Sequence, residues 1–158
     1  MINETTFRQC MGSFATGITV VTTRLNDGAE YGITVNSFTS LSLKPPMILF
    51  CMDHNAYRHD DFLQTEKFAV NILSDQQQEL SQRFASPSMV EWESVPLIPR
   101  EENDTVPLLR GTVAHVVCQT AECFSVGDHT IITAEVVEGE SDASRQPLAY
   151  VRGAYATI

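Results

Sequence analysis

Small hydrogen-bonding side chains crowd residues 32–46, which read GITVNSFTSLSLKPP. The segment opens with the β-branched residues Ile33, Thr34 and Val35, which favour a strand. Five polar side chains then fall within a short stretch: Asn36, Ser37, Thr39, Ser40 and Ser42. These groups are short, neutral donors and acceptors, so they suit a ligand with many acceptors, such as a phosphate or a polar heterocycle.

The spacing of these side chains predicts where they point. Alternate residues of a strand share a face, so Thr34 and Asn36 are expected on one side, and Val35 and Ser37 on the other. Past residue 39 the chain is expected to become irregular, because residues 42–46 end in two prolines and cannot hold a regular ladder. The polar groups would then converge near a strand end. The alternative is an edge strand whose hydroxyls bond nearby backbone.

Two further clusters carry chemistry-bearing side chains. In VGDHT, residues 126–130, His129 follows a Gly-Asp turn and can face a cleft, or it is an ordinary surface histidine. In SQRFA, residues 81–85, Arg83 can meet an anion or pair with a surface acid. Phe84 belongs either to the same site or to the core.

The elements expected to position these groups are mostly strands. We expect strands near residues 18–23, 31–37, 47–52, 67–74, 111–120, 130–139 and 147–153, with helices near 5–14, 56–65 and 75–84. Residues 85–107 contain four prolines and predict a long irregular loop. The pattern indicates a mainly β domain with short helices, a barrel or a sandwich, spanning residues 1–158 as a single domain.

Composition excludes several classes of partner. The formal charge of −10 repels nucleic acid and anionic membrane surfaces, so neither is an expected partner. The longest apolar run, residues 47–52, is too short to span a bilayer, and the first ten residues do not resemble a secretory signal. A cytoplasmic location is therefore expected. No metal site is expected, and no glycine-rich nucleotide-binding motif occurs.

Five blocks of the sequence, in order, resemble one family of enzymes. They are FRQCMGSFATGITVVTT, GITVNSFTSLSLKPPMILFCMD, KFAVNILSDQQQELSQRFA, VGDHTIITAEV and PLAYVRGAY, which together span residues 7–155. They are similar to the flavin reductase-like family, the NAD(P)H:flavin oxidoreductases that act as reductase components of two-component flavin-dependent monooxygenases. The resemblance implies an FMN-binding split β-barrel and a homodimer with flavin near the subunit interface.

The resemblance also implies an activity and a set of site residues. NADH or NADPH would deliver a hydride to FMN or FAD, and the reduced flavin would pass to a separate monooxygenase. The flavin-binding positions would be Thr34, Asn36, Ser37, Ser40, Ser42, Asn55, Arg83, Phe84 and Tyr155. His129 would be the catalytic residue on the nicotinamide side. Where many relatives carry Lys or Ser after the strand that ends in CMD, this chain reads HNAYRHD, so Asn55 or Arg58 would have to meet the phosphate.

Two other functions stay open on the sequence alone. One is a flavin-binding carrier or sensor with the same barrel but without NAD(P)H turnover. The other is a ligand-binding barrel unrelated to flavin, in which the polar segment is only an edge strand. The sequence does not distinguish FMN from FAD, or NADH from NADPH.

Overall fold

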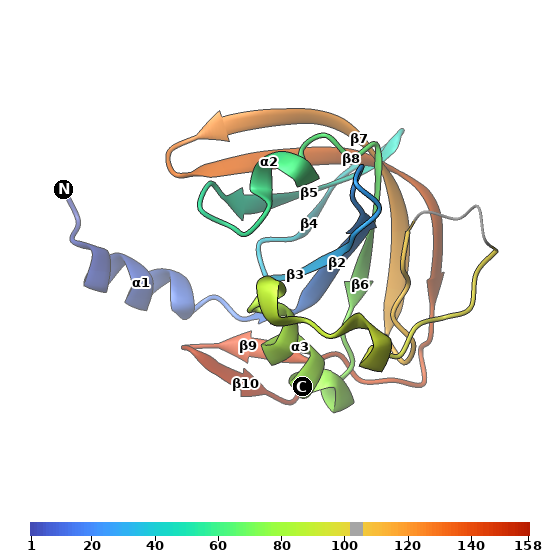
Figure 1. Cartoon of the computed structure of the whole chain (residues 1–158). Helices are drawn as coiled ribbons and strands as arrows, with labels where there is room; N and C mark the ends of the chain where they lie inside the picture. The colour runs from blue at the N-terminus through green and yellow to red at the C-terminus, as the bar shows by residue number, and fades with distance from the viewer. Residues whose placement is uncertain (102–105) are drawn as a thin grey trace.

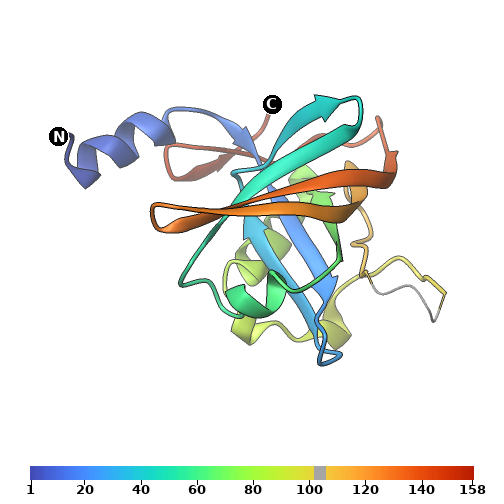
Figure 2. The same cartoon turned by 90° about the horizontal axis from the view of Figure 1, so that it is seen from above.

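The body of the molecule is one antiparallel sheet of seven strands, seen in a computed structural model that describes residues 1–101 and 106–158 (Figure 1). In sheet order the strands are β3 (Glu30–Val35), β2 (Thr19–Arg24), β6 (Lys67–Ile72), β7 (Ala114–Val126), β8 (His129–Ser141), β5 (Pro46–Asp53) and β4 (Thr39–Leu43). The sheet curves until β3 lies against β5, but the edge strands β3 and β4 do not pair (Figure 2). The predicted mainly β architecture is confirmed, in the form of an open barrel.

A second, smaller sheet closes the lower end of the body in Figure 1. It contains β1 (Thr16–Gly17), β9 (Ala149–Val151) and β10 (Ala154–Ala156), with β9 in the middle. The sequence predicts one strand near residues 147–153, whereas the structure has a hairpin. Arg152 and Gly153 form its turn, both with positive φ, 52° and 78°. That backbone conformation favours glycine, and it ends the strand earlier than the apolar pattern indicates.

The helices are short: α1 (Glu4–Gly12), α2 (His59–Phe62), α3 (Gln78–Phe84) and the 3-10 turns η1 (Asp75–Gln77), η2 (Pro87–Met89) and η3 (Trp92–Ser94). The prediction of a helix over 56–65 is wrong in length, because residues 54–58 form turns and the helix has a single turn. The long loop is confirmed for residues 85–101, where only η2 and η3 interrupt it; residues 102–105 lie outside the described residues. No helix among the described ranges has the length and apolarity needed to cross a membrane.

The core fills the barrel and the space beneath it. Phe50, Phe62 and Phe68 pack together inside the barrel with ring centroids 5.5–6.0 Å apart, and Phe50 meets the other two rings edge to face. The strand predicted near residues 47–52 is buried on one face only. Ile48, Phe50 and Met52 point into the core, whereas the alternate residues Met47, Leu49 and Cys51 are only half-buried and face outward. This outward row of Met47, Leu49 and Cys51 lies beside the candidate functional site.

Candidate functional site

The polar segment bridges the two unpaired edges of the sheet. Residues 36–38 connect β3 directly to β4. The Ser37 hydroxyl accepts a hydrogen bond from the Cys51 N–H at 2.9 Å and donates one to the Cys51 carbonyl at 3.0 Å. The linker is therefore fastened to β5 by one side chain. Asn36, by contrast, is exposed, and its amide has no hydrogen bond among the described residues.

The second half of the polar segment is a strand and not an irregular end, which corrects the expectation for residues past 39. Strand β4 pairs with β5 along its length and is exposed throughout. A register shift separates Ser40, which lies opposite Ile48, from Ser42, which lies opposite Met47. Paired residues share a face, so Ser42 lies on the outward side and Ser40 on the side of the core. The structure does not bring these two serines together.

His129 begins β8 as predicted and lies on the same outward face as Cys51. It pairs with Asp53 of β5, two residues along the strand from Cys51, or about 6.6 Å at the usual rise per residue. Its Nδ1 is 2.7 Å from Oδ1 of Asp128, and its side chain is 43% exposed. Asn55 joins this group, because its backbone N–H and its side-chain amide both donate to Asp53 Oδ1, at 2.7 and 3.2 Å.

An apolar strip runs between these polar groups on the outward face. Cys51 lies opposite Ile131, and Ile131 lies opposite Phe124, which is 47% exposed. Burial raises the pKa of the Cys51 thiol, so the sulfur here is an uncharged, weakly polar surface. Neutral donors on one side, an imidazole on the other and an apolar floor between them match the requirements of a flat aromatic ring with polar edges.

Thr34 and Tyr155 meet at a second place, through a residue that sequence reasoning did not single out. The Thr34 hydroxyl donates to the Ser81 carbonyl at 2.7 Å, and the Ser81 hydroxyl is 2.9 Å from the Tyr155 hydroxyl. Ser81 lies on α3, which packs against β3. These contacts tie together segments 47 and 74 residues apart in sequence, so no local pattern could have revealed them.

Three residues predicted near the flavin already contact other residues of the chain. Arg83 contacts Glu79 Oε1 and Ser94 Oγ, both at 3.0 Å, which is the surface-pair alternative. Phe84 is fully buried and packs edge to face on Trp92, so in this arrangement it supports the core and does not line a surface site. Arg58, one of the two residues expected to meet the phosphate, pairs with both Asp27 and Asp61.

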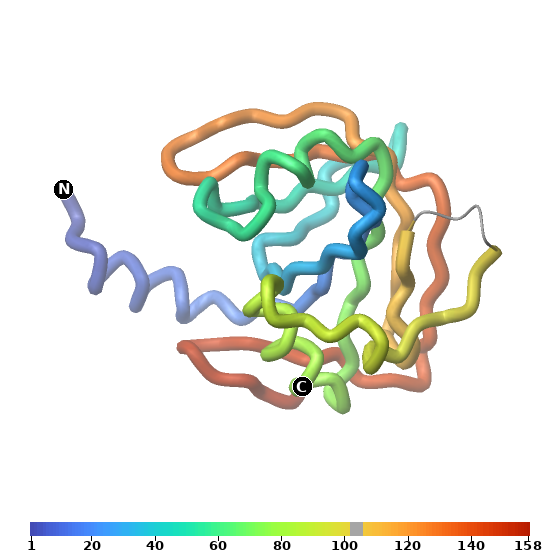
Figure 3. Tube along the Cα trace, in the orientation of Figure 1, coloured from blue at the N-terminus to red at the C-terminus, as the bar shows by residue number. Residues whose placement is uncertain are grey.

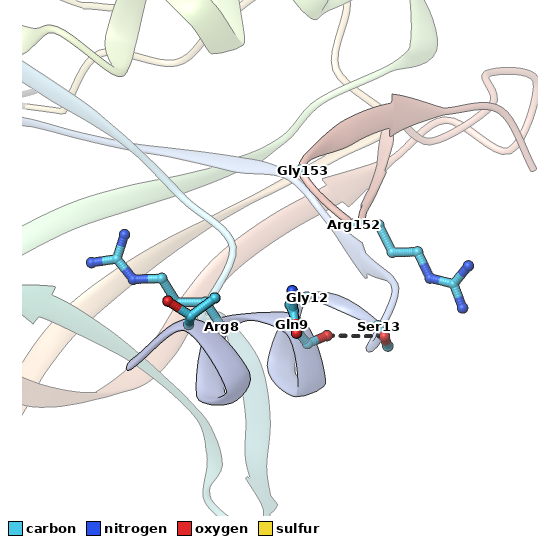
Figure 4. A pocket seen from close by; sticks show the side chains of 7 residues that line it. Arg8, Gln9, Gly12, Ser13, Arg152 and Gly153 are labelled. Carbon is cyan, nitrogen blue, oxygen red and sulfur yellow. Dashed lines mark hydrogen bonds between the residues drawn. The ribbon is translucent and has the colours of Figure 1, made fainter. Parts of the chain in front are cut away.

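A hollow lies away from the predicted site residues, between α1 and the turn of the β9–β10 hairpin. It has a volume of about 580 Å³, and Arg8, Gly12 and Arg152 are among its lining residues. The Arg152 N–H donates to the Gly12 carbonyl at 2.6 Å, which joins the helix end to the hairpin. Figure 4 shows the two arginine side chains at opposite ends and directed away from each other. They do not converge on one anion.

The geometry defines a mainly β protein in which neutral donors and an imidazole border an apolar strip beside an open sheet edge. Within the described parts of the chain, no group of three or more His, Cys, Asp or Glu side chains could hold a metal ion.

The chain belongs to the flavin reductase like domain family, whose model matches residues 11–158. It is 36% identical over 157 residues to the FMN reductase (NADH) SmoA of Agrobacterium fabrum, covering 97% of this chain and 85% of that protein. It is 33% identical over 154 residues to the reductase component of a 4-nitrophenol 4-monooxygenase/4-nitrocatechol 2-monooxygenase of Rhodococcus opacus, covering 98% of this chain and 80% of that one. The resemblance inferred from the five sequence blocks is thereby confirmed.

Solved structures agree with the fold. The NADH:FAD oxidoreductase SgcE6 of Streptomyces globisporus, in complex with NAD and FAD fragments, superposes with a TM-score of 0.90 at 32% identity, covering 99% of this chain and 93% of that one. Flavin reductase PheA2 superposes with a TM-score of 0.86 at 36% identity, covering 99% of each chain. The predicted split-barrel fold class is confirmed by this likeness to flavin reductases.

Proposed function

We propose that this chain is an NAD(P)H-dependent flavin reductase that reduces FMN or FAD and supplies the reduced flavin to a separate monooxygenase. The observation that carries the proposal is the family match across residues 11–158 together with relatives named as FMN reductase and as a monooxygenase reductase component. The hydride acceptor is the flavin ring. The chain's own task is to bind and orient two ring systems.

The residues on the outward face fit that task. Asn36 offers an exposed amide that no described residue occupies, and Ser42 lies on the outward side of an exposed edge strand. These groups would hydrogen-bond the polar edge of a flavin, and His129 would meet the nicotinamide. The nearby cations Arg58 and Arg83 are paired with acids, so the flavin would be held without a strong positive field. We therefore expect moderate affinity, as release to a partner requires.

Steady-state oxidation of the dinucleotide tests the proposal. NADH and NADPH are each combined with FMN, FAD and riboflavin, and the absorbance of the reduced nicotinamide is followed with and without protein. We expect turnover that saturates in both substrates. A rate equal to that of the protein-free mixture, in every combination, would contradict the proposed function.

We also infer that the chain is a homodimer in which α1 is covered by a second copy. Figures 1 to 3 show α1 projecting from the barrel, and none of its residues is buried. Phe7, Met11 and Phe14 are 52%, 56% and 76% exposed. A helix of nine residues is marginal in water without tertiary contacts, so this apolar face needs a partner.

The four free cysteines support a reducing compartment, and we infer the cytoplasm.

A further inference from the structure

His129 is held at one ring nitrogen and open at the other. Nδ1 is 2.7 Å from Asp128 Oδ1, whereas Nε2 has no hydrogen bond to any described residue. The side chain is half-exposed on the outward face of the barrel, opposite Asp53. The free nitrogen is therefore the one available to a ligand.

The backbone of Asp128 is fixed by the turn that carries it. Val126 and His129 pair across the β7–β8 hairpin, and Gly127 adopts a φ of 61°, which suits glycine. The Asp128 carbonyl accepts a hydrogen bond from the His54 N–H at 3.0 Å, so the turn is also tied to the segment that follows β5. The aspartate is thereby held in place beside the imidazole.

The ionisation of Asp128 decides which partner carries the proton. The hydrogen bond to His129 holds the pKa of the Asp128 carboxyl below its usual value, so the group is ionised at neutral pH. An ionised carboxylate only accepts hydrogen bonds, so the proton in the contact belongs to Nδ1. A neutral His129 then carries its only N–H at Nδ1 and presents the lone pair of Nε2. An unconstrained histidine in water prefers the opposite tautomer.

We propose that Asp128 is a positioning residue that keeps neutral His129 in the Nδ1–H form, so that Nε2 accepts a hydrogen bond from an N–H donor of the ligand. Resting on the proposed function, the ligand group is the carboxamide NH₂ of the reduced nicotinamide. The site would recognise the amide through its donor and would lose that recognition in a ligand that offers only a carbonyl.

Nitrogen NMR tests the positioning role without reference to activity. In ¹⁵N-histidine-labelled protein, the His129 signals are assigned by their loss in His129→Gln and read at a pH where the ring is neutral. We expect the Nδ1–H pattern in the wild type and a shift towards the Nε2–H pattern in Asp128→Ala. Asp128 is 88% exposed, so the variant is expected to fold normally, and circular dichroism checks this. A wild-type Nε2–H pattern, or an unchanged pattern in Asp128→Ala, overturns the proposal.

A substrate analogue tests the ligand assignment. Reduced 3-acetylpyridine adenine dinucleotide replaces the amide NH₂ with a methyl group and keeps the carbonyl. The KM ratio of analogue to NADH should be about five- to tenfold larger in the wild type than in His129→Ala, the effect of one hydrogen bond, and intermediate in Asp128→Asn. Equal ratios in all three proteins overturn the amide assignment. Absence of any NADH turnover would instead refute the proposed function. The NMR result on the His129 tautomer would still hold, because it does not depend on turnover.

Discussion

Single side chains of the polar segment differ in how much hydrogen-bonding capacity they have left for a ligand. The Ser37 hydroxyl hydrogen-bonds both the N–H and the carbonyl of Cys51, and the Thr34 hydroxyl donates to the Ser81 carbonyl. Asn36, between them in sequence, has an exposed amide without a partner among the described residues. Asn36 is therefore a predicted flavin-binding position whose loss should affect a ligand and leave the fold intact.

Replacing Asn36 with alanine should weaken flavin binding. One lost hydrogen bond of about 1 kcal/mol corresponds to a rise of about fivefold in the Kd. Quenching of FMN fluorescence on titration with protein measures it. Asn26→Ala is the matched control, because Asn26 is an exposed amide in the turn at the opposite end of β3. If Asn36→Ala and Asn26→Ala bind FMN equally well, Asn36 does not belong to the site.

Replacing His129 with alanine should separate the two ligands. His129 lies one strand away from the Ser37–Cys51 contact, so its loss should spare most flavin contacts. We expect the KM for NADH to rise about five- to tenfold from the loss of one hydrogen bond, with the Kd for FMN changed less than about twofold. Steady-state kinetics and the fluorescence titration give both values. A KM equal to that of the wild type would remove His129 from the nicotinamide side.

The residue types of the site could be predicted from the sequence, but their grouping could not. The position of His129 at the start of a strand follows from its local Gly-Asp turn. The partition of Ser40 and Ser42 onto opposite faces depends on a register shift, which leaves no mark in the alternation of polar residues. The contact of Thr34 with Ser81 depends on how α3 packs against β3. Such long-range contacts follow only from the folded chain.

The close packing of α3 against β3 restricts which residue can occupy position 32. Gly32 of β3 lies over the ring of Phe84 on α3, and a Cβ at Gly32 would come within 2.6 and 2.8 Å of that ring. The ring is fully buried against Trp92, so it has little room to move. The close approach of helix and strand, which also brings Thr34 to Ser81, therefore requires a glycine at this position.

Replacing Gly32 with alanine should destabilise the protein by about 1–3 kcal/mol, the usual cost of overpacking a core. Urea unfolding followed by circular dichroism measures the free energy of unfolding. Gly17→Ala is the matched control, since Gly17 is an exposed strand glycine with no atom within 4 Å of its added Cβ. Equal stability of the two variants would show that α3 does not press on β3 as described.

Element types are well predicted and their ends are not. Strand β2 follows from a run of β-branched residues, and the β2–β3 hairpin follows from the Asp27-Gly28 turn, where Gly28 has a φ of 87°. Strand β4 is missed although Leu41 and Leu43 alternate with serines, because the two prolines that follow indicated an irregular end; pairing with β5 holds these residues in line. Helix α2 is shorter than its pattern predicts because Arg58, at its N-terminus, takes a left-handed conformation.

The whole molecule combines a net charge of −10 with a helix, α1, whose apolar side chains Phe7 and Met11 are not covered by its own barrel. Self-repulsion of this size opposes association, so a dimer must be held by local apolar contact. Phe7 and Met11 of α1, together with Phe14 just beyond its end, provide such a contact. Figure 3 shows the backbone of α1 projecting from the rest of the chain.

A double substitution, Phe7→Glu with Met11→Glu, should shift the protein from dimer to monomer. Buried glutamates would lack partners at that interface, and the cost of burying unpaired charges is several kcal/mol. Sedimentation-velocity ultracentrifugation reports the mass. Met89→Glu is the control, since Met89 is 78% exposed on η2 and not on α1. A wild-type monomer, or a double variant that stays dimeric, would contradict the role of α1.

The central claim is that this barrel brings a reduced nicotinamide and a flavin together for hydride transfer. Its most direct test is anaerobic mixing of the protein with FMN or FAD and NADH, followed by the flavin absorbance near ~450 nm, which disappears when the flavin is reduced. We predict bleaching within seconds, far faster than in the same mixture without protein. Flavin that binds but bleaches only at the protein-free rate would contradict the claim and identify a flavin carrier instead.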